Sequence, residues 1–305
     1  MGALVAGLRR MIAAAPEGLA TSALTRAQRC QLETFAQRTG AVKLERRGGG
    51  AAFVVLAPNV LERHLDALSP HWRDELPADL PRRSRNIAMT RSSKGGSSGH
   101  DVYHLLLKPI GQGAAWSAGA GEESHDLRAI AAPTGGAMIV VSRTDGWHTT
   151  GDLWLVENQA MFDRLDWLPA GACGSVSYFG GEIHGTLLRW LAARPRAGRV
   201  IVFPDYDGNG MSCFQRVANR SAAASQLYLF PGWESALERY GNPQLHQANL
   251  AALEALSGSD MDPWIRAQIA PVLEAMIRTG RALEQEAVWL APGARSSELE
   301  RLELI

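Results

Sequence analysis

Three carboxylates that follow two short apolar runs are the strongest candidates for a chemical role in this chain. Residues 200–203 lead into Asp205 and Asp207, and residues 153–156 lead into Glu157. Alternate residues of an extended segment point to the same side, so Asp205 and Asp207 can lie roughly 7 Å apart at their α-carbons. Clustered carboxylates repel one another unless a cation neutralises them. The pattern therefore predicts a site for Mg2+ or Mn2+, the hard cations used in phosphoryl transfer.

Two other interpretations of residues 205–210 compete with the metal site. The sequence Asp-Tyr-Asp-Gly-Asn-Gly begins like a calcium-binding EF-hand loop. The twelfth loop position is Arg216 rather than a bidentate glutamate, and a strand-like run precedes the stretch, which argues against calcium. Asp, Asn and Gly are also typical of a plain turn after a strand. Glu157 at the end of a second apolar run favours the metal site over the turn.

Buried strands must bring these carboxylates together. Runs as short and apolar as 153–156 and 200–203 fit strands of a parallel sheet covered on both faces. In such sheets, ligands bind outside the carboxyl ends of the strands. We therefore predict an α/β fold with a doubly wound parallel sheet, in which residues 138–141 form a further buried strand. Residues 111–136 are rich in glycine and alanine and predict an irregular segment without a dinucleotide-binding loop.

The placement of Glu157, Asp205 and Asp207 resembles that of a TOPRIM domain, in which one Glu follows the first strand and an Asp-x-Asp pair follows a later one. Short motifs at residues 156–162, 176–181 and 283–286 are similar to those of JetD, the nuclease subunit of Wadjet systems and a relative of the topoisomerase VI A subunit. The resemblance covers roughly residues 85–290 and is specific only at these motifs. It implies a metal-dependent DNA endonuclease in a condensin-like system for defence against plasmids.

The resemblance also extends the predicted site. It implies that Glu286 is a fourth metal ligand, although glutamates near a helix end are typical of solvated surface as well. Asn158 and His184 are candidate accessory residues. His184 lies near the predicted sheet edge and could orient water or touch a phosphate, but a lone histidine is more often structural.

The first 75 residues predict a separate domain. Apolar residues at helical spacing begin the chain, residues 26–38 predict another helix, and residues 42–56 predict a hairpin with a glycine-rich tip. Helices followed by such a hairpin indicate a winged helix, which binds DNA or serves as a dimerisation or protein-contact module. We predict a winged-helix domain at 1–75, a basic linker and connecting segment at 76–150, and a TOPRIM domain with C-terminal helices at 151–305.

Residues 80–100 carry positive charge and no acidic residue. The candidate DNA contacts in this stretch are Arg82, Arg83, Arg85, Arg91 and Lys94. Basic side chains of this kind bind the phosphate backbone without reading its sequence. A flexible basic linker is the alternative interpretation.

Composition limits the remaining possibilities. The 305 residues are 46% hydrophobic and 20% charged, as in ordinary globular proteins, and the formal net charge is zero, so a DNA-binding surface must be a local patch. The three scattered cysteines include no Cys-x-x-Cys pair, which argues against a disulfide framework or zinc ribbon and predicts buried thiols in a reducing cytoplasm. The sequence contains no run of 18 apolar residues, so it predicts no membrane-spanning helix.

These observations together predict a cytoplasmic, metal-dependent endonuclease that acts on double-stranded DNA as a homodimer, with a condensin-like SMC complex as a possible partner. One alternative is a transesterase like the topoisomerase VI A subunit. The first tyrosine of the chain is Tyr103, beyond the predicted winged helix, which argues against the transesterase. The other alternative is a non-catalytic DNA-binding or bridging subunit, against which the intact set of acidic residues argues.

Overall fold

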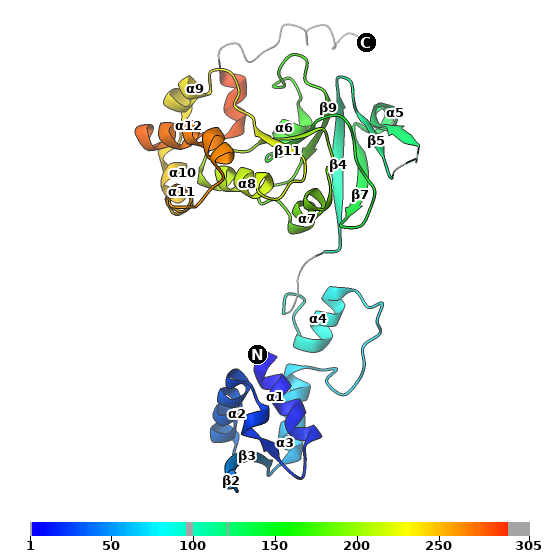
Figure 1. The fold of residues 1–305 in the computed structure, drawn as a ribbon, viewed down its shortest axis with the longest axis vertical. Helices are drawn as coiled ribbons and strands as arrows, with labels where there is room; N and C mark the ends of the chain where they lie inside the picture. The colour runs from blue at the N-terminus through cyan, green and yellow to red at the C-terminus, as the bar shows by residue number, and fades with distance from the viewer. Residues whose placement is uncertain (1, 96–99, 120, 122, 292–305) are drawn as a thin grey trace. The chain divides into compact units, whose positions relative to one another are not determined.

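The computed structural model describes residues 2–95, 100–119, 121 and 123–291. The chain forms two compact units, Met1–Gly99 and His100–Ile305 (Figure 1). None of the helices in the described residues combines the length and the apolar character needed to cross a bilayer.

The first unit packs helices against a small antiparallel sheet with strand order β1-β3-β2. Its elements are α1 (Gly2–Ala13), β1 (Leu19–Ala20), η1 (Thr21–Ala23), α2 (Arg26–Thr39), β2 (Val42–Arg47), β3 (Gly50–Val55), α3 (Pro58–Leu68) and α4 (Arg82–Thr90). A capping box between Thr25 and Gln28 starts α2, and Gly40 ends it with a φ of 64°, a conformation that favours glycine. Leu8, Leu32 and Phe53 are fully buried in the core of this unit.

The second unit is built on a six-stranded sheet with strand order β11-β10-β8-β9-β4-β7. The strands are β4 (Val102–Ile110), β7 (Ala137–Ser142), β8 (Leu153–Val156), β9 (Gly174–Tyr178), β10 (Arg199–Phe203) and β11 (Ala224–Leu227). The strands β11, β10, β8 and β9 run parallel to one another, whereas β4 is antiparallel to both β9 and β7. The α/β class is therefore confirmed, but the sheet is mixed rather than wholly parallel.

Helices connect and cover these strands. They are α5 (Leu127–Thr134), α6 (Gln159–Asp163), α7 (Gly185–Ala193), α8 (Gly208–Ala218), α9 (Trp233–Tyr240), α10 (Pro243–Ala248), α11 (Leu250–Ser257), α12 (Pro263–Thr279) and the 3-10 helix η2 (Gln285–Leu290). Helices α9 to α12 gather beside the β11 end of the sheet, and α5 lies at the β4–β7 end (Figure 1). All four residues of β8 are buried, which explains the uninterrupted apolar run in its sequence.

Residues 76–150 are divided between the two units and do not form one connecting segment. Helix α4 belongs to the first unit, and β4 and β7 belong to the large sheet. Residues 111–136, predicted to be irregular, contain the small hairpin of β5 (Ala115–Ser117) and β6 (Ser124–Asp126), followed by α5. Short-range patterns miss this hairpin because three-residue strands carry almost no periodicity.

Strand β7 is exposed on one face, contrary to the expectation of a fully buried strand. Ile139 and Val141 are buried, whereas Met138 is 54% exposed and Val140 is 43% exposed. Its interior neighbour β4 alternates in the same way, with Leu106 43% exposed, so one face of the sheet is open to solvent at this end. The expectation of buried thiols also holds only for Cys213, because Cys30 is exposed and Cys173 is half-buried.

Candidate metal centre

Two neighbouring strands deliver Glu157 and Asp205 to the same edge of the sheet. Strands β8 and β10 are in parallel register up to the pair Val156 and Phe203, so their carboxyl ends lie side by side. Glu157 follows β8 directly, and Asp205 lies two residues after β10. The backbone N–H of Asp205 donates a hydrogen bond to Glu157 Oε2 at 3.2 Å. The structure thus brings these two predicted site residues into contact.

The 3-10 helix η2 adds Glu286 to this edge. Asn158 Nδ2 donates to Asp205 Oδ1 at 3.0 Å and to Glu286 Oε2 at 3.2 Å, so one amide bridges two carboxylates. The backbone N–H of Gln285 also donates to Asp205 Oδ1 at 2.9 Å. Three segments that are far apart in the sequence, at 157–158, 205 and 285–286, therefore surround one acidic centre.

Asp207 has a different environment from Asp205. It is the N-cap of α8, and its Oδ1 accepts from the backbone N–H of Gly210 at 2.7 Å. Its Oδ2 accepts from Asn249 Nδ2 at 3.1 Å, and the residue is only 6% exposed. Gly210 is required here, because a Cβ at that position would lie 2.0 Å from the Asp205 carbonyl oxygen. Asp207 therefore anchors the start of α8, while its charge still repels Glu157 and Asp205.

Tyr206, between the two aspartates, points away from them as the extended geometry predicted. Its ring is 1% exposed and stacks on Phe230 at 5.5 Å between centroids. Its hydroxyl donates to the Tyr228 carbonyl oxygen at 3.1 Å. Tyr206 thus belongs to the core of the second unit.

Gln285 is a further site residue, and the sequence patterns did not predict it. Its Oε1 accepts from the backbone N–H of Asn158 at 2.9 Å, and its Nε2 donates to the Phe203 carbonyl oxygen. The side chain is 1% exposed and joins the ends of β8 and β10 to η2. No local pattern distinguishes such an amide from a surface glutamine. Its place between Glu284 and Glu286 was the only available signal.

Burial and mutual repulsion make these carboxylates unusually basic. Burial, followed by the Asp205 carboxylate, raises the pKa of Glu157 to about 8. Burial, with further repulsion from Asp207 and Glu286, raises the pKa of Asp205 to about 7. Burial also raises the pKa of Asp207. None of the Arg and Lys ion pairs among the described residues involves these three side chains.

The donor set suits a hard divalent ion by its chemistry. Carboxylate and amide oxygens are the ligands that Mg2+ and Mn2+ prefer, and a cation would relieve the repulsion that raises these pKa values. Within the described part of the chain, however, no three His, Cys, Asp or Glu side chains are already arranged around a common ion position. The carboxylate oxygens of Asp205 and Asp207 are instead held by protein N–H groups.

His184 lies at the start of α7. As the N-cap of that helix, it accepts from the backbone N–H of Thr186 through Nδ1 at 3.2 Å, which leaves the proton of the neutral ring on Nε2. The ring stacks on Tyr103 at 5.5 Å between centroids. Burial, with the nearby His100, lowers the pKa of His184, which favours the neutral ring. Capping and stacking give His184 a structural role.

The predicted DNA contacts belong to the first unit, and the acidic centre belongs to the second. Arg83 and Lys94 are exposed, as are the other three basic residues of the stretch. Arg85 donates to the carbonyl oxygens of Pro77 and Ala78. Arg91 donates to those of Asp66 and Ala67. Arg85 and Arg91 thus stabilise their own unit.

Comparison with known proteins does not assign a family. The chain matches no protein-family model, and no curated protein matches it significantly.

Proposed function

We propose that this protein is a divalent-metal-dependent endonuclease of TOPRIM type that hydrolyses the phosphodiester backbone of double-stranded DNA. The observation that carries the proposal is the convergence of Glu157, Asp205 and Glu286 at the carboxyl end of the sheet, with the charge of Asp207 close by. Carboxylates with pKa values raised to about 8 and about 7 are held ready for a cation. Motif resemblance to JetD supports the same reaction.

Each side chain has a separate task in this proposal. Glu157, Asp205 and Glu286 would hold the ion through carboxylate oxygens, and Asn158 would give up its hydrogen bonds to Asp205 and Glu286. A Mg2+ or Mn2+ ion there would supply an activated water and neutralise the charge on the leaving oxygen. Asp207 and Gln285 keep the strand ends and α8 in place.

The first unit is proposed to be a winged helix that positions duplex DNA. Its order of helices, with the β2–β3 hairpin between α2 and α3, supports this assignment. The exposed basic residues near α4 would then contact the phosphate backbone. A homodimer and a condensin-like SMC complex are the partners that the JetD resemblance supports.

A transesterase remains the second candidate because of one tyrosine. Tyr178 ends β9 and pairs in register with Val156, next to Glu157. A tyrosine at this edge could attack phosphorus directly, so that a tyrosyl phosphodiester forms while one P–O bond of the DNA backbone breaks and a deoxyribose hydroxyl leaves. A non-catalytic bridging subunit gains no comparable support from the site.

Cleavage of supercoiled plasmid DNA tests the proposal. The purified full-length protein should nick or linearise the plasmid with Mn2+ or Mg2+, and Glu157→Gln should reduce the rate by orders of magnitude, because it removes a ligand charge without changing the size of the side chain. Glu182→Gln is the matched control, since Glu182 is an exposed carboxylate paired with Arg216. Equal cleavage by the Glu157→Gln and Glu182→Gln proteins would reject the site.

A further inference from the structure

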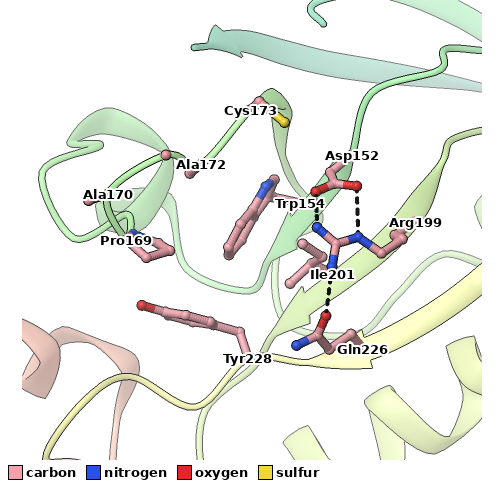
Figure 2. A pocket seen from close by; sticks show the side chains of 11 residues that line it. Asp152, Trp154, Pro169, Ala170, Ala172, Cys173, Arg199, Ile201, Gln226 and Tyr228 are labelled. Atoms are coloured by element: carbon pink, nitrogen blue, oxygen red, sulfur yellow. Dashed lines mark hydrogen bonds and ion pairs between the residues drawn. The ribbon is translucent and has the colours of Figure 1, made fainter. Parts of the chain in front are cut away.

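A stretch of the second unit carries positive charge and no acidic residue. Residues 183–204 contain neither Asp nor Glu and four arginines, Arg189, Arg194, Arg196 and Arg199. Figure 2 shows that Arg199 donates to both carboxylate oxygens of Asp152, at 3.0 and 2.6 Å. Arg196 is buried and pairs with Asp145 at 3.2 Å. The other two arginines are exposed at α7 and form no ion pair with any described carboxylate.

Arg189 belongs to the part of α7 that lies near the acidic centre. Helix α7 begins at Gly185, soon after β9 ends, so its first turns lie at the carboxyl ends of the parallel strands. In the loop between β9 and α7, the backbone N–H of Gly181 donates to the Glu157 carbonyl oxygen at 3.4 Å. His184, the N-cap of α7, follows three residues later and therefore lies within roughly 11 Å of Gly181.

The guanidinium of Arg189 reaches back to the start of the helix and keeps part of its donors free. A Cβ at Gly185 would lie 3.4 Å from Arg189 Nη1. Arg189 Nη2 donates to Thr186 Oγ1 at 2.8 Å and to the His100 carbonyl oxygen at 3.3 Å. None of the hydrogen bonds among the described residues uses Nε or Nη1 of this side chain. These N–H groups form a planar fork that matches two oxygens of a phosphate.

His184 offers a further donor beside Arg189, in addition to its capping role. Its Nδ1 accepts from the helix backbone, so the proton of the neutral ring is on Nε2, and no hydrogen bond within the described chain uses that N–H. Burial, and then the charges of His100 and Arg189, lower the pKa of His184, which places the three side chains close together. Basic groups therefore gather where α7 begins.

The acidic centre needs such a cation to hold its proposed substrate. Glu157, Asp205 and Glu286 carry three negative charges when ionised, and one divalent ion leaves one of them uncompensated. A DNA strand at this centre is therefore repelled unless a nearby cation is free of carboxylate partners. The phosphates of one strand follow one another at roughly 3.4 Å of helix axis, so neighbouring phosphates fall within the distance that separates His184 from the centre.

We propose that Arg189, together with the Nε2–H of His184, binds a backbone phosphate of the DNA strand next to the phosphate that is cut. The fork donates to two non-bridging oxygens of that phosphate and contributes affinity on any base sequence. Thr186 and the His100 carbonyl oxygen hold the fork in place. This inference rests on the proposed function, because its ligand is DNA.

Binding of a duplex of about 20 base pairs in EDTA tests this phosphate site without cleavage. Fluorescence anisotropy of the full-length protein at several salt concentrations gives the affinity and its salt dependence. Arg189→Gln should weaken binding about tenfold at low salt and reduce the slope of log K against log salt by roughly one. Arg194→Gln is the matched control, since it removes the same charge from the other end of α7, and it should change neither quantity by more than about a tenth of the Arg189→Gln effect.

Two further measurements separate phosphate binding from a structural role of Arg189. Arg189→Lys keeps the charge and loses the fork, so the slope should stay the same while the affinity falls about threefold. In the unmodified protein, the duplex should shift the imidazole NMR signal of His184, which His184→Asn identifies because Asn also caps helices. A slope that Arg189→Gln leaves unchanged, or a His184 signal that stays in place while DNA binds, would overturn the proposal.

Plasmid cleavage distinguishes failure of the phosphate site from failure of the proposed function. Arg189→Gln should raise KM about tenfold and leave kcat nearly unchanged, because the carboxylates of the acidic centre are intact. Cleavage with an unchanged KM would reject the phosphate site and leave the nuclease in place. A protein that binds DNA through Arg189 but cuts none with Mn2+ or Mg2+ would support the phosphate site and reject the nuclease.

Discussion

The backbone N–H of Asp205 donates to Glu157 Oε2, while the Asp205 carboxylate repels the same side chain. The hydrogen bond favours the charged form of Glu157, and burial together with repulsion favours the neutral form. Burial and repulsion outweigh the hydrogen bond, because the pKa of Glu157 is raised to about 8. A cation placed between the two side chains would reverse that balance, so proton binding and metal binding compete at this edge.

The stability of the metal-free protein should fall as pH rises through the range of these two pKa values. Glu157 and Asp205 bind protons more tightly when folded, with pKa values of about 8 and about 7 against ordinary values of 4.5 and 3.8. Their contribution is complete below the ordinary values and is lost progressively as pH rises from about 4 to about 8. Thermal unfolding in EDTA should show Tm falling between about pH 5 and pH 8 and levelling off above that.

The competition between protons and metal for Glu157 and Asp205 also predicts how added metal changes Tm. Mn2+ should raise Tm more at the upper end of that pH range than at the lower end, because protons no longer occupy the ligands. Glu157→Gln should flatten both the pH dependence and the response to Mn2+, and Glu182→Gln should leave them unchanged. A Tm of the Glu157→Gln protein that falls with pH as steeply as the unmodified one would contradict the assignment.

Asp205 and Asp207 should differ when each is replaced. Asp205→Asn removes a repelling charge, so the metal-free protein should be as stable as before or more so, but its Tm should no longer respond to Mn2+. Asp207→Ala removes the N-cap of α8 and should cost about 1 kcal/mol with or without metal. Chemical denaturation with and without Mn2+ distinguishes the two. Equal decreases in stability in EDTA would argue against separate roles.

Gln285 should be essential for the geometry of the acidic centre. Gln285→Ala leaves the Asn158 N–H and the Phe203 carbonyl oxygen without their partner, which should cost about 2–4 kcal/mol of unfolding free energy. Gln159→Ala is the control, since Gln159 is exposed and its amide contacts only Asp163 among the described residues. A Gln285→Ala protein that unfolds at the same denaturant concentration as the control would disprove this role.

The parts of the site that follow strands could be predicted from sequence, and the parts that arrive from elsewhere could not. Glu157 and Asp205 were found because β8 and β10 are buried and their ends are marked by a change from apolar to polar residues. Asn249 is 42 positions from Asp207 in the sequence, and local periodicity cannot predict a hydrogen bond between residues so far apart. Resemblance to a family, and not spacing, pointed to Glu286.

The fold shows the same limit. Strands β8, β10 and β7 were readable as apolar runs, whereas β11, with the sequence Ala-Ser-Gln-Leu, has no such run. The antiparallel pairing of β4 with β7 joins residues 30 or more positions apart. The positive charge of residues 80–100 was evident from the sequence, but the groups that its side chains contact were not. Arg85 and Arg91 look like DNA contacts in sequence, yet both donate to carbonyl oxygens of their own unit.

This division of the basic stretch predicts two classes of variant in DNA binding. Neutralising Arg83 and Lys94 together should reduce the slope of log K against log salt by roughly two, one for each phosphate that the protein no longer neutralises, on any DNA sequence. Replacing Arg91 should instead lower the stability of the first unit, because its hydrogen bonds to two carbonyl oxygens disappear. Fluorescence anisotropy at several salt concentrations measures the slope. An unchanged slope in the Arg83 and Lys94 double variant would make this stretch a connector.

Strand scission should be hydrolytic and should leave no covalent link between protein and DNA. The two tyrosines to test are Tyr178, which ends β9 beside Val156, and Tyr103, which stacks on His184. Burial raises the pKa of Tyr103, which disfavours the phenolate needed for attack. Tyr178→Phe and Tyr103→Phe should therefore both cut at nearly the unmodified rate. Denaturing gels of end-labelled DNA provide the measurement, and a protein-linked strand that disappears in Tyr178→Phe would establish the transesterase instead.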